Sequence, residues 1–187
     1  MLNNKLIENS FIKIKNTKIK YILKRKKSNV ANFSVVFLCG YKSDMNGTKA
    51  CYIDKLQKKI GFEYLRFDYS GHGSSEGAIE QRNLTNWVYE SLTIIEKKTN
   101  HPIILIGSSM GGWISLLLAK KLKTKLLGII GIATAIDFTM NIIDNLSQRK
   151  KLFYKKNLFI KVPNEYSKDG HVFTKKFLKK IKKKKTL

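Results

Sequence analysis

The sequence predicts an α/β fold built on a mostly parallel, doubly wound sheet. Short apolar runs alternate with segments of helical periodicity, as in chains of βαβ units. Glycine-rich segments follow three of the predicted strands, at Gly40, at 71–73 and at 107–112. The carboxyl ends of parallel strands meet at one edge of a sheet, where such folds place their sites. With 187 residues and 43% hydrophobic content, the chain can bury the core of one domain.

The first predicted element is a two-stranded hairpin at an edge of the sheet. Residues 11–24 alternate apolar side chains with lysine around Asn16 and Thr17, which is the period of a half-buried strand. A short β-branched and aromatic run over 33–38 then predicts a buried strand that ends at Gly40.

From residue 48 to residue 132 the alternation is regular. The predicted elements are a helix over 48–60 with Gly61 as its C-cap, a strand over 62–67, a helix over 84–98, a strand over 102–106, a helix over 110–122 and a strand over 126–132. The pattern weakens after Ala135. We therefore divide the chain into an α/β core over 1–135, a lid-like insertion over 136–174 with a helix over 137–146, and a lysine-rich tail over 175–187. We expect the tail to be disordered or a frayed, solvated helix.

Residues 107–113, Gly-Ser-Ser-Met-Gly-Gly-Trp, follow directly on a buried strand. A serine with glycines two residues before and after it, between a strand and a helix, is typical of a nucleophile elbow. We predict that Ser109 is a nucleophile. The backbone N–H groups of Met110, in the first turn of the next helix, and of Tyr41, after Gly40, are the predicted donors to an oxyanion.

A base and an orienting acid for Ser109 are hard to find. His72 precedes the serine and is more consistent with a loop-shaping residue, and His101 lies before the elbow strand, on the opposite side of the sheet from the site. His171 has the right order, but no strand is predicted to deliver it. Asp137 is a weak candidate acid after the last predicted strand, with capping of the next helix as the alternative.

Two further acidic residues have structural interpretations. Asp68 is expected to hold its own glycine-rich loop, and Asp44 is expected to form a turn.

The formal charge of +24 comes mainly from lysine. Clustered cations are typical of proteins that bind nucleic acid or anionic lipid. Lysine is spread over the whole chain, however, as in proteins encoded by AT-rich DNA, so we expect no specific nucleic-acid partner.

Cys39 and Cys51 indicate reduced thiols and a cytoplasmic protein. No apolar run is long enough for a transmembrane helix.

Three segments together resemble the α/β-hydrolase superfamily. They are 37–50 (FLCGYKSDMNGTKA), 66–75 (RFDYSGHGSS) and 107–113 (GSSMGGW). More narrowly, the chain is similar to bacterial hydrolases related to the mitochondrial palmitoyl-protein thioesterase of the α/β-hydrolase-domain group, over residues 33–166. The resemblance implies a Ser-Asp-His triad that cleaves esters or thioesters through an acyl-enzyme, without a cofactor or metal. For a eukaryotic chain it implies the mitochondrial matrix.

The resemblance places the acid and the base on later βα units, where this chain has the lysine run 182–185. We therefore expect a chain truncated at its C-terminus, by a frameshift or an early stop, that lacks the last strands and helices and tends to associate through an exposed sheet edge.

Three hypotheses for function follow. The first is a serine esterase or thioesterase acting on small-molecule or acylated-protein substrates. The second is an inactive remnant or a non-catalytic binding protein without the triad Asp and His. The third is a basic nucleic-acid or membrane-surface binder that uses the lysine-rich tail.

Overall fold

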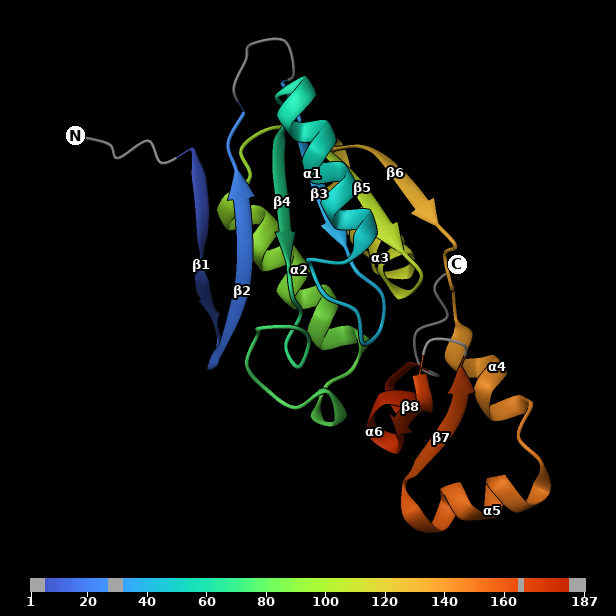
Figure 1. Ribbon diagram of the computed structural model, residues 1–187. Helices are drawn as coiled ribbons and strands as arrows, with labels where there is room; N and C mark the ends of the chain where they lie inside the picture. Colours follow the sequence, from blue (N-terminus) through green and yellow to red (C-terminus); the bar gives the residue numbers. More distant parts are fainter. Residues whose placement is uncertain (1–5, 27–31, 165–166, 182–187) are drawn as a thin grey trace.

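The computed structural model describes residues 6–26, 32–164 and 167–181, and its main sheet is mostly parallel (Figure 1). The strands lie in the order β1-β2-β4-β3-β5-β6. Strands β3 to β6 run parallel to one another, and β2 is antiparallel to both of its neighbours, β1 and β4. The strands are β1 (Ile7–Ile14), β2 (Thr17–Lys24), β3 (Ser34–Leu38), β4 (Glu63–Phe67), β5 (Ile103–Ser108) and β6 (Leu126–Ile132). The hairpin at the sheet edge is confirmed, with its first strand starting earlier than predicted.

Helices cover both faces of this sheet, which confirms the doubly wound fold. In Figure 1, α1 lies on one face, and α2 and α3 lie together on the other. Their bounds are α1 (Thr48–Ile60), α2 (Leu84–Lys98) and α3 (Met110–Leu122), with the short 3-10 turns η1 (Ile79–Gln81) and η2 (Lys123–Lys125). As predicted, α1 ends at Gly61, whose φ of 89° is the left-handed conformation that glycine adopts without strain.

Trp87 on α2 and Trp113 on α3 are fully buried against the sheet. Asn83 begins α2 with a reciprocal capping box, in which Asn83 and Asn86 each accept a hydrogen bond from the other's backbone N–H. The Trp87 indole N–H donates to the Ser70 carbonyl at 3.0 Å, which joins α2 to the loop that follows β4.

The chain after β6 forms a smaller layer beyond the carboxyl ends of the parallel strands (Figure 1). It consists of α4 (Phe138–Asp144), α5 (Gln148–Asn157), the antiparallel pair β7 (Phe159–Asn164) and β8 (Ser167–Thr174), and α6 (Lys175–Ile181). The helix predicted over 137–146 is present. The β7–β8 hairpin was not predicted, because its short strands carry a lysine and a proline among their apolar residues.

The expectation for the lysine-rich tail is wrong for residues 175–181. These residues form α6, in which Phe177 and Leu178 are 2% and 1% exposed. The Phe177 ring lies 5.6 Å from that of Tyr41 and 5.7 Å from that of Trp87, measured between centroids. Two apolar side chains in a lysine-rich segment thus suffice to dock a short helix. Residues 182–187 lie outside the described part of the chain.

At the other edge of the sheet, β6 leaves large apolar side chains in solvent. Leu127 is 59% exposed and Ile130 is 52% exposed. Among the helices of the described residues, none has both the length and the apolar character needed to cross a bilayer.

Candidate active site

Ser109 occupies the bend between β5 and α3. Its φ of 53° and ψ of −118° lie in a region that side-chain-bearing residues rarely adopt. The surrounding backbone holds this conformation: the Ser109 N–H donates to the Ile132 carbonyl at 2.9 Å, and the Ser109 carbonyl accepts from the N–H groups of Gly112 at 3.0 Å and Ala135 at 3.2 Å. The serine is therefore fixed between β6 and the start of α3.

The glycines on either side of Ser109 let the elbow pack closely. A Cβ at Gly111 would overlap the carbonyl oxygen of Leu38 at the end of β3, and a Cβ at Gly107 would overlap the carbonyl of Gly111. The strand, the bend and the helix can therefore approach one another only where no side chain intervenes. The predicted strand-to-helix elbow is present in the structure.

Ser109 opens onto a cavity of about 880 Å³ between the core and the layer formed by α4 to α6. Eight of the lining residues precede β6, namely Gly40, Tyr41, Lys42, Ser43, Asp44, Lys49, Ser108 and Ser109. The rest comes from the chain after β6, namely Ala133, Ala135, Phe138, Ile142, Val162, Pro163, His171 and Phe173. The volume is within the range of small-molecule sites.

The two predicted oxyanion donors belong to segments that flank Ser109. Met110 is the first residue of α3, where backbone N–H groups have no carbonyl partner within the helix and the helix dipole favours negative charge. Gly40, which precedes Tyr41, is adjacent to the serine: a Cβ at Gly40 would lie 3.4 Å from the Ser109 Cβ and 4.0 Å from its Oγ. The absence of a side chain at Gly40 leaves space beside the hydroxyl.

The side chain of Tyr41 turns toward the outer layer. Its ring stacks on that of Phe173, with centroids 5.0 Å apart, and its hydroxyl donates to the Val172 carbonyl at 2.9 Å. Burial raises the pKa of the Tyr41 phenol, so the group stays protonated and remains a donor. Tyr41 thus joins the loop beside Ser109 to β8.

The three histidines lie in different environments. His72 is 3% exposed among aromatic rings, and burial lowers its pKa from 6.5 to about 4. Its Nδ1 lies 3.4 Å from the Ser70 carbonyl oxygen, its hydrogen-bond partner among the described residues. This confirms the loop-shaping role expected for it. His101 lies just before β5, at the amino end of the strand and away from Ser109, as expected.

His171 is the histidine that the structure brings to the cavity. It lies on β8, a strand that the sequence pattern did not reveal, and its ring centroid is 5.3 Å from that of Tyr41. Burial and the nearby Lys42 cation lower the pKa of His171. Among the described residues, Ser109 Oγ forms no hydrogen bond, so no serine–histidine pair is assembled there.

The carboxylates do not complete a triad in this part of the chain. Asp137 is half-buried immediately before α4 and is not one of the residues lining the cavity.

Asp68 accepts hydrogen bonds from the N–H groups of Met45 at 2.7 Å and Ser74 at 2.9 Å, which confirms that it holds its glycine-rich loop. Burial raises the Asp68 pKa, and these bonds oppose the rise. Asp44 accepts from the Asn46 N–H at 2.7 Å, as a turn former does.

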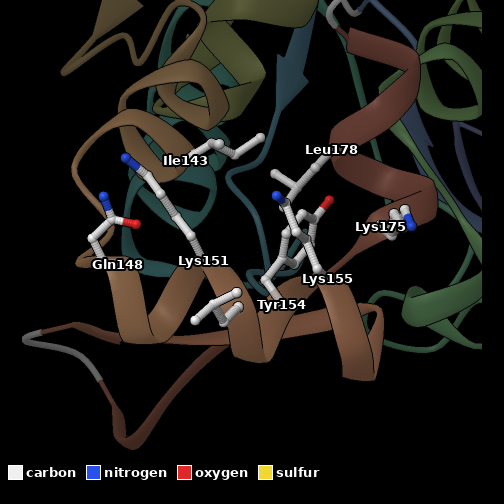
Figure 2. Close-up of a pocket in the computed structure, with 8 residues that line it drawn as sticks. Ile143, Gln148, Lys151, Tyr154, Lys155, Lys175 and Leu178 are labelled. Atoms are coloured by element: carbon white, nitrogen blue, oxygen red, sulfur yellow. The ribbon is translucent and has the colours of Figure 1, made fainter.

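A second cavity of about 420 Å³ lies between α4, α5 and α6 (Figure 2). Lys151, Lys155 and Lys175 border it together with apolar side chains such as Ile143 and Leu178, and no carboxylate lines it. Within the described ranges, no three His, Cys, Asp or Glu side chains are grouped as a metal site.

Comparison with known proteins agrees with this geometry. The family model described as "Serine aminopeptidase, S33" matches residues 31–185. The human palmitoyl-protein thioesterase ABHD10, mitochondrial, is 39% identical over 136 residues, which are 73% of this chain and 44% of that protein; its bovine counterpart is 38% identical over 137 residues, again 73% and 44%.

A solved structure of mouse alpha/beta hydrolase domain-containing protein 10 superposes with a TM-score of 0.83 at 30% identity, over 94% of this chain and 70% of that one. The match to this chain covers less than half the length of the human and bovine thioesterases.

Proposed function

Because the chain belongs to the serine aminopeptidase S33 family of α/β hydrolases, we propose that it is a serine hydrolase that cleaves carboxylic esters or thioesters through an acyl-enzyme on Ser109. The observation that carries the proposal is the bend at Ser109, where the backbone has a φ of 53° and the residue lies on the wall of the 880 Å³ cavity. A strained strand-to-helix turn of this kind exposes the serine hydroxyl to a substrate.

In the proposed reaction, Ser109 Oγ attacks the carbonyl carbon of the substrate and loses its proton to a base. The carbonyl oxygen becomes an oxyanion that accepts hydrogen bonds from the backbone N–H groups of Met110 and Tyr41. Collapse of this intermediate breaks the bond to the alcohol or thiol, which leaves with a proton, and an acyl group stays on Ser109. Water then attacks the acyl-enzyme, releases the carboxylic acid and restores the hydroxyl.

The cavity walls support an acyl substrate. Phe138, Ile142, Val162 and Phe173 provide an apolar surface from the chain after β6, which we propose acts as a lid over 136–174. The thioesterase named among the relatives favours a thioester, either a small molecule or an acylated protein, as the substrate class.

One observation favours a second candidate, a protein that keeps the fold without turnover. Within the described residues, neither an imidazole nor a carboxylate is hydrogen-bonded to Ser109. Without a base, the serine hydroxyl is a weak nucleophile.

The test is hydrolysis of a long-chain acyl thioester, followed through release of the thiol. We expect turnover by the wild-type chain, loss of at least 100-fold in Ser109→Ala, and retention in Ser108→Ala, whose hydroxyl belongs to the neighbouring residue on the same cavity wall. Absence of turnover in a folded wild-type chain would support the second candidate.

A further inference from the structure

Four large apolar side chains are exposed within eight residues at the junction of α5 and β7. Leu152 is 65% exposed, Phe153 47%, Leu158 52% and Phe159 39%. The rings of Phe153 and Phe159 contact each other edge to face, with centroids 5.6 Å apart, so the two elements share one apolar surface. Contiguous exposed apolar side chains of this kind mark interaction sites.

Basic residues surround this surface. The helix α5 carries Arg149, Lys150, Lys151, Lys155 and Lys156, and it carries no acidic residue. None of these five forms an ion pair with another described residue. Because α-helical neighbours lie three or four residues apart, Arg149 and Lys156 lie beside Leu152 and Phe153 on one exposed face. We call these six residues, Arg149, Leu152, Phe153, Lys156, Leu158 and Phe159, the α5–β7 corner.

The adjacent side of α5 adds further positive charge. Lys151 and Lys155 extend from α5 along the second cavity, with Lys175 of α6 across from them (Figure 2). The Lys151 ammonium donates to the backbone carbonyl of Asp144 at 3.3 Å, and no carboxylate neutralises the three lysines among the residues lining the cavity. The positive field therefore continues from the corner to the neighbouring cavity.

We propose that the α5–β7 corner docks on the surface of an anionic phospholipid bilayer. Exposed Phe and Leu side chains enter the boundary between headgroups and acyl chains, while Arg and Lys on the same face pair with lipid phosphates. Long basic side chains suit this arrangement because their apolar stems lie along the acyl region and their charged ends reach the headgroups. A nucleic acid would use the cations, but it would leave the four apolar side chains in water.

Docking would also bring the catalytic cavity to the membrane. Strand β7 runs from Phe159 in the corner to Val162 and Pro163 on the wall of the Ser109 cavity. At about 3.3 Å per residue, the two points are roughly 10 Å apart along the strand. The delivery of membrane-borne acyl groups rests on the proposed function, whereas the docking itself does not.

The experiment is co-sedimentation of the purified chain with vesicles of phosphatidylcholine alone or with 30% phosphatidylglycerol, at 50 mM and 500 mM salt. We expect binding to the anionic vesicles that weakens at high salt. The double variant R149Q/K156Q should lower the partition coefficient about 30-fold, which corresponds to about 2 kcal/mol. The matched control K58Q/K59Q removes two exposed lysines from the end of α1 and should change binding no more than twofold.

A second pair of variants tests the apolar part of the corner. Phe153→Asp should reduce binding at least tenfold, whereas Tyr52→Asp, at a 63% exposed aromatic on α1, should not. The proposal is overturned if neutral and anionic vesicles bind equally, if the control variants lose as much binding as the corner variants, or if the corner instead mediates self-association. Because vesicle binding is read without substrate, an inactive chain that docks would contradict the proposed function and leave this proposal standing.

Discussion

Tyr41, beside the nucleophile elbow, donates a side-chain hydrogen bond to the carbonyl of Val172 on β8, across 131 positions of the sequence. This bond joins the loop that follows β3 to the layer that covers the cavity. The Phe173 ring stacks on the Tyr41 ring with centroids 5.0 Å apart, and the tilted Phe177 ring contacts it with centroids 5.6 Å apart. The outer layer is therefore attached to the core beside Ser109.

Tyr41→Phe removes this hydrogen bond and keeps the ring. We expect a loss of about 1 kcal/mol in unfolding free energy, since the Val172 carbonyl loses its donor. Hydrogen exchange should accelerate in 159–174 and stay unchanged in β3 to β5. Tyr52→Phe, in which an exposed tyrosine loses its hydroxyl, is the control. Equal exchange in the two variants would show that the bond does not hold the layer.

Phe177→Ala tests the docking of α6. The side chain is 2% exposed, and truncation of a buried phenylalanine costs about 3–5 kcal/mol. Lys176→Ala, one residue earlier and exposed, should be neutral. The measurement is chemical denaturation of both variants. A Phe177→Ala protein as stable as wild type would restore the original expectation of a solvated tail.

His72 should make the protein less stable in acid. Its pKa is lowered from 6.5 to about 4 by burial, so between these pH values the unfolded chain binds a proton that the folded chain does not. Stability from this group is fully present above pH 6.5 and falls as the pH decreases toward 4, by about 3 kcal/mol in total. Denaturation of wild type and His72→Gln across this range should show a smaller pH dependence in the variant. Parallel curves would mean that His72 titrates normally in the folded protein.

Gly111→Ala should be far more harmful than Gly128→Ala. A Cβ at Gly111 meets the fixed backbone of Leu38, whereas a Cβ at Gly128 meets nothing within 4 Å. We expect Gly111→Ala to lose at least about 3 kcal/mol, because neither the helix nor the strand can move without breaking the elbow. Gly128→Ala, on exposed β6, should change stability by less than about 1 kcal/mol. Thermal denaturation of both variants gives the comparison, and similar melting temperatures would contradict the tight packing at the elbow.

The sequence predicts the core well because its signals there are local. The bounds predicted for α1, α2 and α3 agree with the structure, since apolar periodicity and the C-cap at Gly61 are local signals of where helices begin and end. The elbow is equally local, because the conformation of Ser109 depends on glycines at fixed offsets.

The sequence predicts the outer layer poorly because long-range contacts decide it. His171 reaches the cavity only through the pairing of β7 with β8, and neither strand alternates clearly enough to be recognised. Phe177 contacts the rings of Tyr41 and Trp87, which lie about 90 or more positions earlier in the sequence. The helix α6 contains four lysines among its seven residues, so its sequence pattern does not indicate a buried face. The one signal in the sequence is the apolar pair Phe177-Leu178 within the lysine-rich tail.

The central claim is that the Ser109 hydroxyl is a reactive nucleophile, and covalent labelling tests it most directly. The purified chain is treated with a fluorophosphonate, and the modified residue is located by peptide mass spectrometry in wild type, Ser109→Ala and Ser108→Ala. The account predicts one phosphonyl group per chain, on Ser109, that disappears in Ser109→Ala and persists in Ser108→Ala. A folded wild-type chain that stays unlabelled, or that carries the label on another residue, would contradict it.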